Sequence, residues 1–223
     1  MKCWPRRAKP GMSVSPETEI LSRYEGEMMF DQKQNRASIE EQPLEIRVLE
    51  EIRHTVSQID AVEIEQAVQV LARSKRVFLT GAGRSLLMMR AFAMRLMHFG
   101  LTAYVVGDTT TPAITADDLL VIGSGSGETK GLISQAEKAK AIGCHILLFT
   151  IFPASSLAQI AQSRVIIPGA TSKSIDNPYQ TRQPGGNLFE QSLLIFLDCL
   201  IIRLGERLHI DFSRLSQLHA NLE

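Results

Sequence analysis

The segment Ser124-Gly-Ser-Gly-Glu-Thr129 is rich in hydroxyl groups and glycine, which suits it to binding an anion. Its glycines allow backbone N–H groups to turn inward, and Ser124, Ser126 and Thr129 can each donate a hydrogen bond to a phosphate oxygen. A helix is expected to begin at Glu128, and the N-terminus of a helix adds positive potential. The segment is not a P-loop, because the lysine of that motif is absent. The pattern predicts a phosphate-binding loop, and a solvated Ser/Gly loop is the alternative.

A second glycine turn, Thr80-Gly-Ala-Gly-Arg-Ser85, follows an apolar run and opens a helical pattern. Gly81 and Gly83 allow a tight turn and a close approach of the backbone to a ligand. The turn is not a dinucleotide-binding motif, because Leu86 stands where the third glycine of that motif would be. Arg84 can pair with an anion or donate to sugar hydroxyls. A plain tight turn is the structural alternative.

Glu190 is a candidate general base, because it lies in the first turn of the most apolar helical pattern of the chain, residues 188–208. A carboxylate held between apolar surroundings and a helix N-terminus is suited to proton transfer. Asn187 is a candidate N-cap for the same helix. The alternative for Glu190 is an ordinary carboxylate in the first turn of a helix.

These residues require a scaffold, and short apolar runs alternate with helical patterns from residue 77 onward. Strands that are apolar on both faces and separated by helices indicate a parallel sheet covered on both sides. The sequence therefore predicts an α/β fold, a doubly wound five-stranded parallel sheet of flavodoxin type. Ligands bind beyond the carboxyl ends of such strands, where both glycine turns fall. The expected strands are 77–80, 103–106, 119–122, 145–150 and 165–167, and the expected helices are 85–98, 128–142, 155–162, 188–208 and 213–219.

The chain divides by composition near residue 44. Residues 1–43 are polar, rich in proline and without a sustained period, so they are expected to form an irregular N-terminal extension. Helical spacing begins at Leu44, a second helix is expected with Asp60 as N-cap, and 44–223 is the predicted domain. No apolar stretch is long enough to span a membrane and none resembles a signal peptide, which indicates a soluble, cytoplasmic protein.

The charges of the 223 residues balance, with 24 Lys+Arg against 24 Asp+Glu. A balanced chain is an improbable nucleic-acid binder, so the positive potential for an anionic ligand must come from local groups. The three cysteines have no metal-like spacing. Cys144 and Cys199 are expected to be buried free thiols. Neither a metal nor a cofactor is predicted.

Several segments resemble the 6-phospho-3-hexuloisomerases, single-domain members of the sugar isomerase (SIS) family. The resemblance covers roughly residues 44–223 and implies the isomerisation of D-arabino-hex-3-ulose 6-phosphate to D-fructose 6-phosphate. It also implies a homotetramer without a metal, acting in the formaldehyde-fixing ribulose monophosphate pathway. The chain departs from the usual family residues at Leu86, Gly185 and Asn187. The segments are Gly81-Ala-Gly-Arg-Ser85, Phe92-Ala-Met-Arg-Leu-Met-His98, Ser124-Gly-Ser-Gly-Glu-Thr129, Leu188-Phe-Glu190 and His219-Ala-Asn-Leu-Glu223.

The resemblance also implies a role for each site residue. Glu190 would take the proton from C2 of the 3-ketose to give a cis-enediol, and Arg84 and His219 are candidates for moving the hydroxyl proton and stabilising the enediolate. His219 would reach a neighbouring subunit's site, or would be an exposed tail residue. His98 is expected to be a packing residue. The residues expected to bind the substrate are Gly83, Arg84, Ser85, Ser124, Gly125, Ser126, Gly127, Glu128 and Thr129.

Two other functions stay open at this point. One is another SIS-type isomerase that acts on a pentose or heptose phosphate. The other is a non-catalytic sugar-phosphate-binding regulator, although residues 1–43 are too short and too aperiodic for the helix-turn-helix module that such regulators carry.

Overall fold

The computed structural model describes residues 42–169 and 181–211. Contacts divide the chain into two units, residues 1–47 and 48–223; the division at residue 44 into extension and domain stays a prediction. The elements are α2 (Leu44–Ser57), α3 (Ala61–Arg73), β1 (Arg76–Gly81), α4 (Gly83–His98), β2 (Thr102–Val105), β3 (Leu119–Gly123), α5 (Lys130–Ile142), β4 (His145–Thr150), α6 (Ser156–Ile160), β5 (Ser163–Ile166) and α7 (Asn187–Leu208).

The five strands form one parallel sheet in the order β2-β1-β3-β4-β5. This confirms the predicted doubly wound sheet. The chain order reverses between β1 and β3, the point at which open sheets of this kind bind ligands. In the register, Gly81 at the end of β1 is opposite Gly123 at the end of β3. The two glycine turns therefore start side by side at one edge of the sheet.

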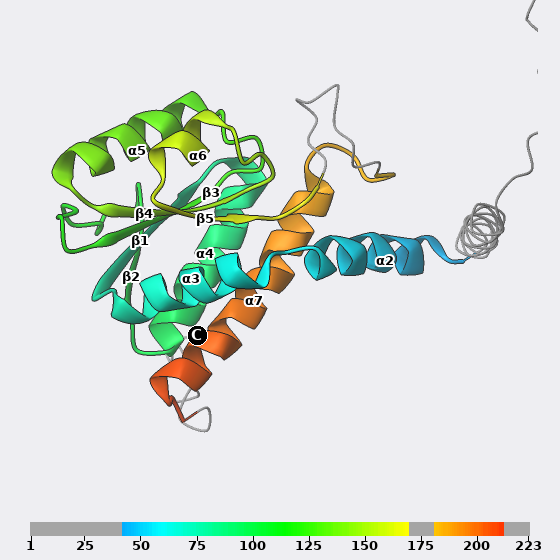
Figure 1. Cartoon of the computed structure of the whole chain (residues 1–223), viewed down its shortest axis with the longest axis horizontal. Coiled ribbons are helices and arrows are strands. Elements are labelled where there is room, and N and C mark those ends of the chain that lie inside the picture. Colours follow the sequence, from blue (N-terminus) through cyan, green and yellow to red (C-terminus); the bar gives the residue numbers. More distant parts are fainter. Residues whose placement is uncertain (1–41, 170–180, 212–223) are drawn as a thin grey trace, which may run out of the picture. The chain divides into compact units, whose positions relative to one another are not determined.

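Helices cover both faces of the sheet, with α5 and α6 on one face and α3, α4 and α7 on the other (Figure 1). Successive side chains of a strand point to opposite faces. In β1, Val77 and Leu79 accordingly pack into the core under α3, α4 and α7, whereas Phe78 packs into the core under α5 and α6. Both faces of the sheet are buried under helices, which explains why the strands are apolar at nearly every position.

The predicted elements are present in the described residues with small shifts at their ends. One shift matters for the site: the helix expected from Glu128 begins at Lys130, with Thr129 as its N-cap. The prediction of Asp60 as N-cap of α3 is confirmed, since its carboxylate accepts hydrogen bonds from the amides of Val62 and Glu63. The helix expected at 213–219 lies outside the described residues.

The two described cysteines differ in their surroundings. Cys144 is buried, as predicted, and burial raises the pKa of its thiol to about 11. The thiol is therefore protonated at neutral pH, which makes it a poor nucleophile. Cys199 is exposed on α7, so the prediction that it is buried was wrong. The apolar pattern around it belongs to the long helix, one side of which is exposed.

No helix among the described residues has the length and apolar character needed to cross a membrane.

Candidate active site

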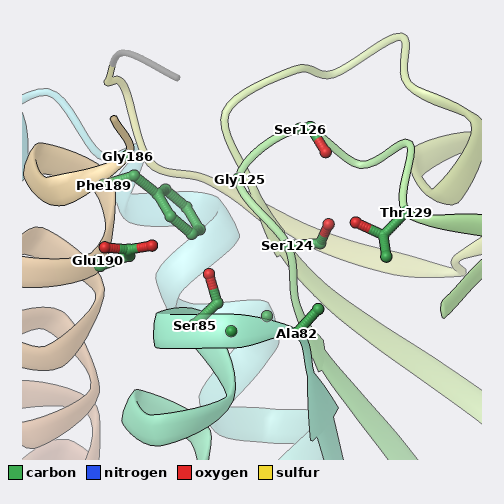
Figure 2. Close-up of a pocket in the computed structure, with 11 residues that line it drawn as sticks. Ala82, Ser85, Ser124, Gly125, Ser126, Thr129, Gly186, Phe189 and Glu190 are labelled. Carbon is green, nitrogen blue, oxygen red and sulfur yellow. The ribbon is translucent and has the colours of Figure 1, made fainter. Parts of the chain in front are cut away.

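A cavity of about 280 Å³ lies at the carboxyl ends of β1 and β3, between the starts of α4, α5 and α7 (Figure 2). This is the position at which a sheet of this topology binds ligands. The described residues that line it are Ala82, Gly83, Ser85, Gly123, Ser124, Gly125, Ser126, Thr129, Gly186, Phe189 and Glu190.

The three helices that open on the cavity begin without a side-chain cap. Their N-cap residues are Ala82, Thr129 and Gly186, and none of these described residues makes a side-chain cap hydrogen bond. By contrast, Asp60 caps α3 and Ser155 caps α6, both away from the cavity. The first N–H groups of a helix have no partner within the helix. Three sets of such groups around one cavity form a binding place for an anion.

Thr129 shows this most clearly. Threonine is a good N-cap because its hydroxyl can accept a bond from the helix it precedes. Here the hydroxyl of Thr129 makes no such bond within the described chain and lies on the cavity wall beside that of Ser124 (Figure 2). The side chain is therefore available to a ligand.

The loop between β3 and α5 is held by hydrogen bonds that fix its direction. Gly125 and Gly127 accept, through their carbonyl oxygens, from the amides of Ile151 and Leu157 at 3.1 Å each. Gly127 has φ +65°, and a Cβ there would lie 2.1 Å from Oγ of Ser155. Glycine is required at this position both by the backbone conformation and by the space available.

The loop hydroxyls keep their hydrogens available. Oγ of Ser124, a residue only 4% exposed, accepts from the amide of Gly127 at 3.2 Å. Oγ of Ser126 accepts from the amide of Glu128 at 3.3 Å. Because each hydroxyl acts as acceptor within the loop, its O–H hydrogen can be donated to a ligand.

The turn between β1 and α4 forms the floor of the cavity. A Cβ on Gly81 would lie 3.0 Å from the amide nitrogen of Leu86 and 3.1 Å from the carbonyl oxygen of Gly123, so glycine allows the two turns to meet. Ser85 points its hydroxyl into the cavity (Figure 2). Leu86 packs against the hydrophobic core, so this departure from the usual family glycine does not fill the cavity.

Glu190 lies in the first turn of α7 and faces the loop from across the cavity (Figure 2). Its Oε2 accepts a hydrogen bond from Nε of Arg84 at 2.6 Å; the Glu190 side chain is 14% exposed and the Arg84 side chain 54% exposed. The hydrogen bond joins helices α4 and α7 through two residues that are 106 positions apart in sequence. A guanidinium has five N–H donors, so Arg84 can donate one hydrogen bond to Glu190 and another to a ligand oxygen at the same time.

The sequence and the fold were compared with known proteins. Residues 70–181 match the SIS domain family. The chain is 42% identical over 176 residues to the 3-hexulose-6-phosphate isomerase of Bacillus subtilis, covering 79% of this chain and 95% of the relative. It is 44% identical over 176 residues to the enzyme of the same name from Mycobacterium gastri, covering 79% and 88%. The chain belongs to the 3-hexulose-6-phosphate isomerase family of SIS-domain proteins.

A solved structure shares the fold of the family. The crystal structure of a hypothetical protein from Methanococcus jannaschii, for which a molecular function of 3-hexulose-6-phosphate isomerase has been inferred, matches with a TM-score of 0.64. It is 35% identical in sequence, and the match covers 72% of this chain and 86% of that one.

Most of the site residues that the family resemblance suggested lie together on the cavity wall: Gly83, Ser85, Ser124, Gly125, Ser126, Thr129 and Glu190. Arg84 is hydrogen-bonded to Glu190 and is not among the described lining residues. Gly127 is a buried residue of the loop and is not among the described lining residues. Glu128 turns its carboxylate to Ser156 at the start of α6. His219 lies outside the described residues.

His98 lies at the far end of α4, roughly 22 Å of helix rise from Gly83. It is buried, in agreement with the predicted packing role. Gly186 is the N-cap of α7, so the prediction of Asn187 as cap was wrong. Gly185 has φ +63°, a conformation that glycine adopts readily, so its departure from the usual family residue fits the turn.

Two contributions were missed by sequence reasoning. Phe189 forms an apolar wall, and a Cβ on Gly125 would lie 3.0 Å from its ring. Its place beside Glu190 in the motif was the available signal. Glu51 of α2 accepts from Oγ1 of Thr181 at 2.6 Å, from the amide of Arg182 at 3.3 Å and from Nε2 of Gln183 at 3.2 Å. Glu51 thereby holds the segment that leads into α7, and no local pattern points to this contact.

The described residues contain no group of His, Cys, Asp and Glu arranged to hold a metal ion.

Proposed function

We propose that this protein interconverts D-arabino-hex-3-ulose 6-phosphate and D-fructose 6-phosphate. The observation that carries the proposal is that one cavity has hydroxyl groups suited to a phosphate on one wall and a carboxylate suited to proton transfer on the opposite wall. A hydroxyl-rich loop and the start of α5, which has no side-chain cap, suit a phosphate, and Glu190 in the first turn of α7 faces them across the cavity. The membership of the isomerase family supports the same reaction.

The phosphate binds at the loop wall. Ser124, Ser126 and Thr129 donate hydroxyl hydrogens, and the amides in the first turn of α5 add the positive end of the helix dipole. These groups are neutral, so a chain with no net charge can bind an anion without a cluster of lysines.

The proton transfer takes place at the opposite wall. Glu190 removes the proton from C2 of the 3-ketose, and a cis-enediol forms between C2 and C3. The proton then returns at C3, and the hydrogen of the C2 hydroxyl is transferred to the oxygen at C3, so that C2 becomes the carbonyl of the 2-ketose. The electrons balance within the substrate. Arg84, already hydrogen-bonded to Glu190, stabilises the negative charge that develops on the enediolate oxygen.

The finer parts of the proposal follow the family resemblance. The reaction belongs to the ribulose monophosphate pathway in the cytoplasm, His219 assists in proton transfer, and the protein forms a homotetramer. A subunit interface is supported by apolar side chains exposed at seven-residue spacing on two neighbouring helices, Leu87 and Met94 on α4 and Ile195 and Ile202 on α7.

The proposal is tested by incubating the full chain with enzymatically prepared D-arabino-hex-3-ulose 6-phosphate and measuring the fructose 6-phosphate formed. Turnover that requires the phosphorylated substrate is expected. No turnover at micromolar enzyme, or equal turnover of pentose phosphates, would overturn the assignment.

A further inference from the structure

We infer that Glu128 is a positioning residue, which holds the phosphate loop in its binding conformation by fastening it to the start of α6. The inference rests on the proposed phosphate site. Oε1 of Glu128 accepts from the backbone amide of Ser156 at 2.7 Å, and Oε2 accepts from Oγ of the same serine at 2.7 Å. Both carboxylate oxygens are thus directed to one residue, 28 positions further along the chain.

The two hydrogen bonds belong to a wider attachment between the loop and α6. The carbonyl oxygen of Gly127, the residue before Glu128, accepts from the amide of Leu157 at 3.1 Å. The same glycine lies so close to Ser155 that a Cβ would clash with its hydroxyl. The backbone and the side chain of consecutive loop residues therefore contact consecutive residues of α6.

The attachment affects both partners. α6 has five residues, Ser156–Ile160, and so short a helix has little stability of its own. The loop has two glycines, and within it the amides of Gly127 and Glu128 donate to the hydroxyls of Ser124 and Ser126. Each segment restricts the freedom of the other, so the loop reaches the ligand with less conformational entropy left to lose.

The direction of the carboxylate also matters for the charge of the site. The hydrogen bonds from the hydroxyl and the amide of Ser156 lower the pKa of Glu128, so the side chain is ionised at neutral pH. A negative group turned toward a phosphate would repel it. Because the carboxylate is hydrogen-bonded to Ser156, it fixes the loop. Its negative charge is directed to donors outside the cavity.

The test is a double-mutant cycle on the full chain, with the KM for fructose 6-phosphate as readout. Glu128→Ala is expected to raise the KM roughly three- to tenfold and to change kcat less than about twofold. The expected rise corresponds to the net value of an ordinary hydrogen bond, because the two bonds to Ser156 are exposed to solvent. Ser156→Ala removes one of the two donors and is expected to raise the KM about twofold to threefold. The double variant is expected to be no worse than Glu128→Ala alone.

Two further variants separate positioning from other roles. Glu128→Gln keeps an acceptor oxygen for the Ser156 amide and is expected to restore a near-native KM. Glu137→Ala removes an exposed carboxylate on α5 and is the matched control, with no expected change. If the effects of Glu128→Ala and Ser156→Ala multiply, or if Glu128→Ala leaves the KM within twofold of the native value, the inference is wrong.

The same variants are also measured by calorimetric titration with inorganic phosphate. A native protein that binds phosphate but does not turn over the hexulose phosphate contradicts the proposed function alone. The inference about Glu128 then stands or falls on whether the dissociation constants of the variants follow the expected pattern. A native protein that does not bind phosphate contradicts both.

Discussion

In the proposed reaction the chemistry depends on Glu190, a mostly shielded carboxylate on the wall opposite the hydroxyl-rich loop. Glu190→Gln keeps the shape of the side chain and removes the base. We expect kcat to fall about 10²- to 10⁴-fold, the usual contribution of general base catalysis, with little change in KM. Steady-state kinetics with the hexulose phosphate measure both constants, and a fall of less than about tenfold would show that another group is the base.

The sequence was sufficient to predict that this residue and the hydroxyls opposite it lie around one cavity, and their roles in the reaction stay a prediction. Ser124, Ser126 and Thr129 stand close together in a strand-to-helix turn, and the topology rule places such a turn at the ligand. The direction of Glu128 could not be predicted. It depends on a rotamer and on a partner, Ser156, whose position follows from how α6 packs. Spacing alone made Glu128 look equivalent to its neighbours in the motif.

Among the elements, α2 has a role that its sequence does not show, since Glu51 binds three groups of residues 181–183. These residues lead into α7, which carries Glu190. We expect Glu51→Ala to lower kcat several-fold with a smaller change in KM, because the base loses its fixed position. Steady-state kinetics are again the measurement.

Glu50→Ala is the matched control for Glu51→Ala. The carboxylate of Glu50 pairs with Arg53 within α2, and its loss should leave the kinetics unchanged. Equal effects of the two substitutions would mean that only the stability of α2 matters.

The strands were predictable as elements because Val77, Phe78 and Leu79 need an apolar partner on both faces. The start of α5 was not, because helix ends depend on cap geometry. A threonine before a helical pattern, as at Thr129, favours an N-cap whose hydroxyl bonds to the helix. In the structure that hydroxyl makes no cap hydrogen bond, and Thr129 lines the cavity instead.

At the scale of the whole molecule, the edge of the sheet opposite the cavity contributes stability. Asp118 is buried before β3 and binds Arg76 of β1 through both of its oxygens, and Thr115 as well. Burial on its own raises the pKa of Asp118, but the hydrogen bonds from Arg76 and Thr115 lower it below its usual value of 3.8. A carboxyl group whose pKa is lower in the folded than in the unfolded protein stabilises the fold when the pH is above the unfolded-state pKa. This stabilisation is lost as the pH falls through the folded-state pKa.

We therefore expect Asp118→Asn to lower the free energy of unfolding at neutral pH by about 2 kcal/mol or more, since it leaves a buried network without its charge. The difference from the native protein should shrink as the pH falls below about 3.8. Urea unfolding at several pH values measures it. Asp117→Asn, at an exposed neighbour, is the control. A loss of kcat without a loss of stability would contradict this structural role.

The proposed assembly makes a prediction at the same scale. Ile202→Glu puts a charge on the exposed apolar stripe of α7 and should lower the molar mass of the native oligomer in light scattering. Val62→Glu, at an exposed apolar residue of α3, should leave the mass unchanged. A native protein that is already monomeric would contradict the homotetramer.

The absent side-chain caps on α4, α5 and α7 have a consequence beyond binding. A side-chain cap contributes about 0.5–2 kcal/mol to a helix, so these three helices forgo stability that sequence changes could readily supply. A phosphate bound at the loop would supply the missing acceptor at the start of α5, and a ligand that binds the folded state raises its stability with concentration. If the phosphate site is as proposed, we expect the protein to be most resistant to unfolding and proteolysis when its substrate is abundant, so that its lifetime follows the supply of that metabolite.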